Sequence, residues 1–74
     1  MIDLKKIATK LEDEEKLILK YKFPITDAKG NVVIEEREDR LLDVAEDAGI
    51  LYVSHKNEVL WVKLDEVIEV IEEK

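Results

Sequence analysis

The sequence contains no cysteine and no glutamine, only two glycines, one proline, one histidine and one tryptophan in 74 residues. Without cysteine, a disulfide framework, a thiolate zinc site, an iron–sulfur cluster and a thiol nucleophile are all excluded. No run of about 20 apolar residues is present, which excludes a helical membrane span. No basic and apolar leader opens the sequence, so we expect a cytoplasmic protein.

Positive charge is also in short supply. Twelve lysine and arginine residues face 19 aspartate and glutamate residues, which gives a net charge of -7. Such a chain repels phosphate backbones, so we expect neither a nucleic acid nor a membrane as its partner. Hydrophobic residues make up 46% of the chain in short pieces, enough for a single domain over residues 1–74. The abundance of Glu and Lys is typical of thermophile proteins and of idealised designs, and composition does not separate these origins.

An amphipathic helix is predicted within residues 1–14. Its apolar face follows the i, i+3, i+4, i+7 spacing of Leu4, Ile7, Ala8 and Leu11. Asp3 is placed to act as the N-cap. The acidic run that begins at Glu12 should end the helix, because it would crowd negative charge at the negative end of the helix dipole.

Two strands are predicted around a turn at residues 26–31. Apolar side chains alternate along residues 16–23, which is typical of a strand. Pro24 removes a ladder donor, and the turn-forming composition of residues 26–31 leads into a second strand at residues 32–35.

Residues 40–48 and 65–73 each fit both a helix and a strand. The first segment offers a helical face that stops at Gly49, and equally a strand followed by a turn. The second segment is dense in β-branched residues, which favours a strand. Strands in both segments give a mainly-β protein with an N-terminal helix, whereas helices in both give an open αββαββα sandwich.

Residues 50–54 and 59–63 form a predicted hairpin around residues 55–58. Pairing of Ser54 with Val59 would place Tyr52 opposite Trp61. Both faces of the hairpin are apolar, so it needs cover on both sides or leaves a patch for a partner. We expect Tyr52 and Trp61 to lie in the core under the first helix, because so short a chain can hardly spare its only tryptophan. In the alternative, an exposed aromatic anchor, the candidate partner-binding residues are Ile50, Tyr52, Val59 and Trp61.

The order of elements resembles the Sm-like or SH3-like small barrel: a helix, the strand LILKYKF, strands through VVIE, LLDVAED, ILYVSH and VLWVKL, and a last strand VIEVIEE. Residues 62–70 are similar to the end of the YolD-like family, where a strand runs into a short turn containing Asp and a final Ile/Val strand. WYL domains share this phrase more loosely. The glycines and basic residues typical of the middle strands of the YolD-like family are missing. The resemblance implies a five-stranded barrel over residues 16–73 that acts as a regulatory or adaptor module.

The residues that could carry catalysis are few and scattered. His55 is the only histidine and lies in a predicted turn, and Ser54 beside it points to the opposite face of the strand. Acidic pairs such as Asp43 with Asp47 are more typical of a solvated helix face than of a cation site. We therefore predict no catalytic, cofactor-binding or metal-binding residue, and no enzyme.

Three hypotheses about function follow. The first is a binding or regulatory module that recognises a protein, or a second copy of itself, through a strand edge or an aromatic patch. The second is an acidic nucleic-acid mimic that inhibits a DNA- or RNA-handling enzyme, with carboxylates at positions 35, 36, 46, 47, 69, 72 and 73. The third is a designed or orphan domain without an evolved partner. The first two differ in salt dependence, because binding by a mimic should collapse as ionic strength rises.

Overall fold

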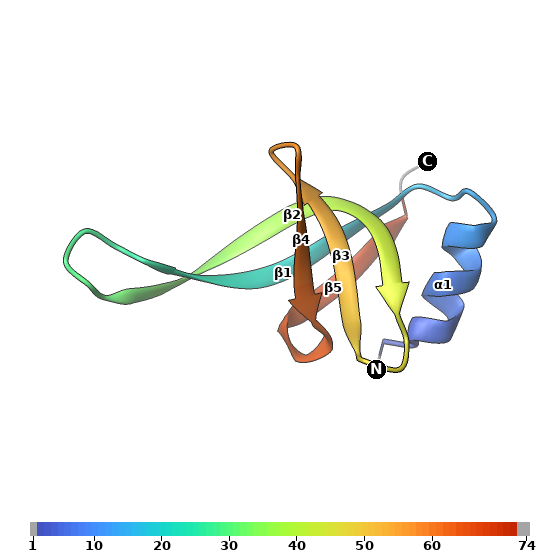
Figure 1. Cartoon of the computed structure of the whole chain (residues 1–74), viewed down its shortest axis with the longest axis horizontal. Coiled ribbons are helices and arrows are strands. Elements are labelled where there is room, and N and C mark those ends of the chain that lie inside the picture. Colours follow the sequence, from blue (N-terminus) through green and yellow to red (C-terminus); the bar gives the residue numbers. More distant parts are fainter. Residues whose placement is uncertain (1, 73–74) are drawn as a thin grey trace.

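The computed structural model describes residues 2–72 and shows one short helix followed by a five-stranded antiparallel sheet (Figure 1). In chain order, the elements are α1 (Leu4–Glu12), β1 (Leu17–Thr26), β2 (Val32–Ala45), β3 (Ile50–His55), β4 (Glu58–Lys63), the 3-10 turn η1 (Leu64–Glu66) and β5 (Val67–Glu72). The protein is mainly β with an N-terminal helix, as predicted. Residues 1 and 73, which the predicted helix and last strand include, lie outside the described residues.

The helix begins and ends where its capping residues predict. The Asp3 carboxylate accepts hydrogen bonds from the backbone N–H groups of Lys5 and Lys6, at 3.0 and 3.4 Å. These bonds satisfy donors that have no partner within the helix. After the last helical residue, Glu14 takes a left-handed φ of 62°, which turns the chain towards β1. Ile7 is buried in the core, so the predicted apolar face is the one that docks.

The predicted second and third strands are one continuous strand. β2 runs for 14 residues and pairs first with β1 and then with β3. The expectation of two strands is wrong, because the charged residues between them have basic neighbours on β1. Glu36 lies opposite Lys22, and Glu38 lies opposite Lys20. Pairs of opposite charge across a ladder stabilise an extended segment that has few apolar residues of its own.

The two segments that fit both a helix and a strand, residues 40–48 and 65–73, form strands over most of their described length. Residues 40–45 belong to β2, with a bulge between Leu41 and Asp43 that leaves Leu42 unpaired. Residues 67–72 form β5 and pair with β1 through a second bulge. The strand interpretation is thus confirmed, and the open αββαββα sandwich is wrong. The β3–β4 hairpin also has the predicted register, with Lys56 and Asn57 at φ values of 50° and 67° in its two-residue turn.

The order of strands in the sheet is β4-β3-β2-β1-β5, so β4 and β5 are the two edge strands. Among residues 2–72, β4 pairs only with β3, and β5 pairs only with β1. Side chains from the inner face of the sheet meet α1 in one core, whose buried members are Ile7, Leu17, Leu19, Tyr21, Leu41, Leu51, Val53 and Val62.

The expectation that Tyr52 and Trp61 lie in this core is wrong, because Tyr52 is half-buried outside the core cluster and Trp61 is exposed. Val62, the neighbour of Trp61, points inward, so Trp61 points to the outer face of the sheet, which α1 does not cover.

β1 and β2 extend beyond the other strands as a two-stranded arm, on the left of Figure 1. β5 pairs with β1 only as far as Tyr21, and β3 reaches β2 only from Arg40. Within the described part of the chain, no third strand adjoins the pairs from Lys22–Glu36 outward, and Pro24 is tolerated there because β1 has only one neighbour. The arm makes the molecule elongated, at 44 × 23 × 18 Å, and lies at the opposite end from α1. We call residues 24–34 the distal arm and the other described residues the body.

Candidate functional site

The four predicted partner-binding residues lie together on the outer face of the β3–β4 hairpin. We call this group the aromatic patch: Ile50, Tyr52, Val59 and Trp61. Residues two apart on a strand share a face, and the register places Tyr52 directly opposite Trp61. The intervening residues Leu51 and Val62 are buried. The patch is therefore supported from beneath by the core.

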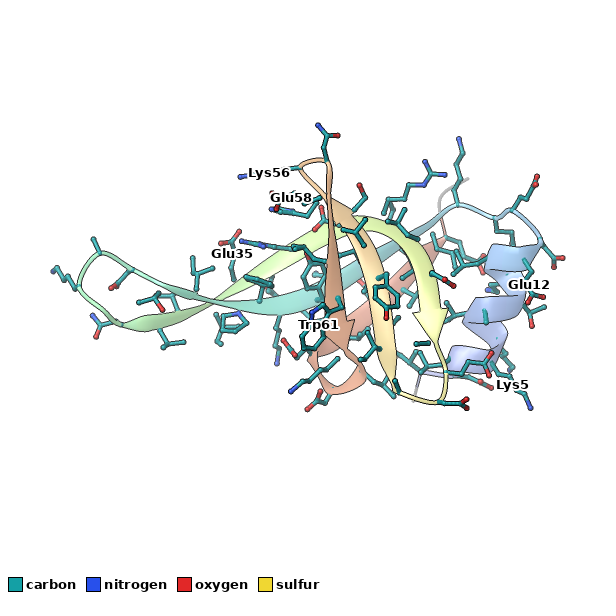
Figure 2. All side chains as sticks on the ribbon, viewed as in Figure 1. Lys5, Glu12, Glu35, Lys56, Glu58 and Trp61 are labelled. Carbon is teal, nitrogen blue, oxygen red and sulfur yellow. The ribbon has the colours of Figure 1, made fainter. Side chains whose placement is uncertain are left out.

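The two residues that β4 contributes to the patch are largely exposed to solvent. Val59 is 65% exposed and Trp61 is 59% exposed, whereas Ile50 and Tyr52 are half-buried. In Figure 2, Trp61 lies beside β4 on the side away from α1. A large apolar side chain on a rigid sheet is the kind of residue that contributes most to protein interfaces.

The free edge of β4 borders the patch. Its central residues, 59–62, are uncharged, and no other strand within residues 2–72 pairs with its outer side. The other edge strand, β5, carries Glu69 and Glu72 and faces α1 across a groove, where Glu72 forms an ion pair with Lys10. Because charged side chains on an edge strand discourage pairing, β4 is the more accessible edge for an added strand.

A partly buried polar cluster of Tyr21, Asp39 and His55 joins β1, β2 and β3 beside the core. Tyr21 is fully buried, and its hydroxyl donates a hydrogen bond to Oδ2 of Asp39 at 2.6 Å. Nδ1 of His55 lies 3.1 Å from the same oxygen and 3.2 Å from Oδ1. Burial, followed by the hydrogen bond and the negative charge of Asp39, raises the pKa of Tyr21 to about 12, although Arg37 acts in the opposite direction.

The sequence analysis missed this cluster, although a signal was present. Asp39 precedes the buried Leu41 by two residues, and His55 follows the buried Val53 by two, so both occupy inward positions. A polar residue at an inward position needs a partner. Since Tyr21 and His55 both bond to Asp39, and no buried side-chain nitrogen or oxygen in residues 2–72 lacks a partner, the geometry fits a structural role.

The carboxylates of the acidic-mimic hypothesis are spread around the molecule. Glu35 and Glu36 point to opposite faces of β2 because they are consecutive strand residues. Residues 46 and 47 lie in the turn between β2 and β3, while residues 69 and 72 lie on β5. Residue 73 is outside the described residues. The described carboxylates therefore do not form one continuous row.

Metal and membrane sites receive no support from the described chain. Residues 2–72 contain no cluster of three or more His, Cys, Asp or Glu side chains arranged to hold a metal ion. None of the described helices has the length and apolar character needed to cross a membrane. Comparisons of the chain with protein-family models, with curated proteins and with solved structures each found no match. The aromatic patch and the free edge of β4 together form the candidate functional site.

Proposed function

We propose that this chain is a non-enzymatic binding module that recognises a protein partner through the aromatic patch and the adjoining free edge of β4. The observation that carries the proposal is the exposure of Trp61 and Val59 on the same face of an edge strand, β4. Tryptophan and tyrosine supply large contact areas with few rotatable bonds, so they lose little entropy on binding. A partner that covers Trp61 would remove the largest exposed apolar side chain from water.

The partner we propose is an extended segment of another protein that adds to β4 as a further strand. Its main-chain groups would pair with the free N–H and C=O groups along residues 59–62. Its outward side chains would then lie next to Val59 and Trp61 on the extended outer face. Backbone pairing supplies affinity in this mode, and the aromatic patch supplies selectivity.

We further propose that the curved sheet is a Sm-like or SH3-like small barrel related to the YolD-like family, and more loosely to WYL domains. The N-terminal helix, the turn that contains Asp65 and the Ile/Val-rich last strand follow the order that the resemblance implies. Modules of this kind act as regulators or adaptors, which fits a protein that binds through a strand edge.

The experiment compares three immobilised full-length proteins: wild type, Trp61→Ala and the control Ile34→Ser. Ile34 is an apolar residue of the distal arm whose exposed fraction, 57%, is close to the 59% of Trp61, so the control truncates a similarly exposed side chain at another place. We expect a protein that is retained by wild type and control at about 0.5 M NaCl and is lost with Trp61→Ala. With that protein purified, Trp61→Ala should weaken binding at least about 10-fold, and binding should shift the Trp61 emission of wild type to shorter wavelength.

Two results would contradict the proposal. Retention that is unchanged by Trp61→Ala would exclude the aromatic patch as the binding site. Retention that disappears at high salt but survives Trp61→Ala would support the acidic-mimic hypothesis instead, because charge–charge attraction is screened by salt whereas an apolar contact is not.

A further inference from the structure

Three consecutive residues of the distal arm are among the most exposed hydrophobic residues in the described chain. Val32 is 69% exposed and Ile34 is 57% exposed, and Val33 between them is exposed on the opposite face. On the outer face, Ile34 pairs with Pro24 and Val32 pairs with Thr26. This outer face of the distal arm therefore carries no charged side chain.

The arm has an ordered turn and an ordered base. The Asp27 carboxylate accepts hydrogen bonds from the backbone N–H groups of Lys29 and Asn31, both at 2.9 Å. At the base, the Arg37 guanidinium lies 4.1 Å from the centroid of the Phe23 ring. A two-stranded ribbon with no cover is marginally stable in water, so a surface that covered one face would stabilise the arm.

Charge is distributed unequally between the arm and the rest of the chain. Asp27 and Lys29 are the only charged residues of the distal arm, and they cancel, so all of the net charge of -7 lies elsewhere. Two copies that met body to body would repel each other strongly. Two copies that met at their arms would hold the bodies at opposite ends of an assembly of 44 Å-long molecules. Screening acts over about 8 Å at physiological ionic strength, so the bodies would repel little.

We propose that the distal arm is a self-association surface, through which two copies of this chain form a dimer arm to arm. In a two-fold arrangement, Pro24, Val32 and Ile34 of one copy pack against the same residues of the other, which closes the assembly at two copies. The contact is small, so the dimer is expected to be of micromolar affinity or weaker. A lipid surface is a poorer fit, because the distal arm has no aromatic residue and only one lysine. This dimer does not depend on the aromatic patch.

The first test is sedimentation velocity of the full chain from about 10 µM to about 1 mM. The double variant Val32→Thr/Ile34→Thr keeps β-branched side chains at exposed strand positions, so it should fold, as circular dichroism will show. Val59→Thr is the control, because it makes one of these two changes, valine to threonine, at an exposed valine of the body. We expect wild type and control to dimerise as concentration rises, and the arm variant to associate at least about 10-fold more weakly.

The second test needs no destabilising change. The chain has no cysteine, so single spin labels can be placed with Ala28→Cys at the arm tip and Glu12→Cys on α1. In the dimer, the two Ala28 labels should lie closer than the 44 Å length of one chain, and the two Glu12 labels farther apart than that. Raising the salt concentration should leave the dimer intact or strengthen it, since only repulsion between the bodies is screened.

The following results would overturn the proposal. They are a wild-type chain that stays monomeric at the highest concentration, an arm variant that dimerises as wild type does, Glu12 labels closer together than Ala28 labels, and a dimer that dissociates as salt rises. Loss of the dimer with Val59→Thr would also contradict it and would place the contact on the β4 edge, as the predicted strand-edge homodimer requires.

Discussion

The aromatic patch and the distal arm are both exposed and apolar, but they differ in what lies behind and around them. The patch lies over the buried Leu51 and Val62 and is part of a body that carries the net negative charge. The distal arm has no third strand beside it among the described residues, and its charged residues cancel. Exposure alone therefore does not define a binding partner. A supported patch on a charged body suits a different protein, whereas an uncharged arm far from that body suits a second copy.

The largest expected loss of stability comes from truncating a core side chain beneath the aromatic patch. Leu51→Ala deletes a fully buried side chain of the core, which should lower the free energy of unfolding by about 3 kcal/mol. That is a large part of the stability of so small a domain. Leu42→Ala, the same change at an exposed bulge residue, should lower it by less than about 1 kcal/mol. Urea unfolding followed by circular dichroism measures both, and equal losses would contradict the assignment of the core.

The next effect concerns Tyr21, which lies where β5 stops pairing with β1 and the arm begins. Its pKa of about 12 in the folded protein exceeds the ordinary value of 10.0. Between these two values the folded state keeps the hydroxyl proton that the unfolded state loses. The stabilisation is therefore fully present below pH 10 and falls as pH rises through 12, by on the order of 2 kcal/mol.

Urea unfolding of wild type and Tyr21→Phe near pH 9 and near pH 11.5 isolates this contribution. The free energy of unfolding should fall more steeply with pH in wild type than in the variant, because phenylalanine has no proton to lose. Parallel pH dependence in the two proteins would show that neither burial nor the hydrogen bond to Asp39 raises the pKa of Tyr21 in solution.

Local patterns in the sequence predicted most of the secondary structure. Asp3 as N-cap, the register of Tyr52 with Trp61 and the strand at residues 67–72 each depend on neighbouring residues or on a two-residue turn. The four patch residues share a face for the same reason, since alternation along two paired strands fixes which side chains lie on the same side of the sheet. Their role in binding stays a prediction.

What the sequence did not predict depends on contacts between distant residues. The continuity of β2 depends on lysines of β1 opposite Glu36 and Glu38. The exposure of Trp61 depends on which face α1 covers, and periodicity in α1 alone does not specify that face. The bond from Tyr21 to Asp39 joins residues 18 positions apart. Tertiary packing decides each of these features, and no local pattern encodes it.

A smaller loss of stability is expected when glycine is replaced by alanine, once in the distal arm and once in the body. Gly30 in the arm turn and Gly49 before β3 have φ values of 84° and 66°, so alanine at either position adds strain of about 1 kcal/mol. No atom blocks an added Cβ at Gly30, which leaves the backbone conformation as the source of strain. In amide hydrogen exchange, Gly30→Ala should speed exchange in the arm alone, while Gly49→Ala should lower protection throughout the body. Faster exchange of the body in Gly30→Ala would mean that the arm and the body unfold together.

The smallest effect on stability is expected for Val32→Thr, because the side chain at this position is 69% exposed and the added hydroxyl stays in contact with water in the folded monomer. In dilute protein the free energy of unfolding should change by less than about 0.5 kcal/mol, whereas Val62→Thr buries a hydroxyl in the core and should cost about 1–3 kcal/mol. The informative quantity is the difference in melting temperature between dilute and concentrated samples. Dimerisation stabilises the folded state by mass action, so the melting temperature of wild type should rise with concentration and that of Val32→Thr should rise less. A rise of the same size in both proteins would mean that the outer face of the arm remains in contact with water when the chains associate.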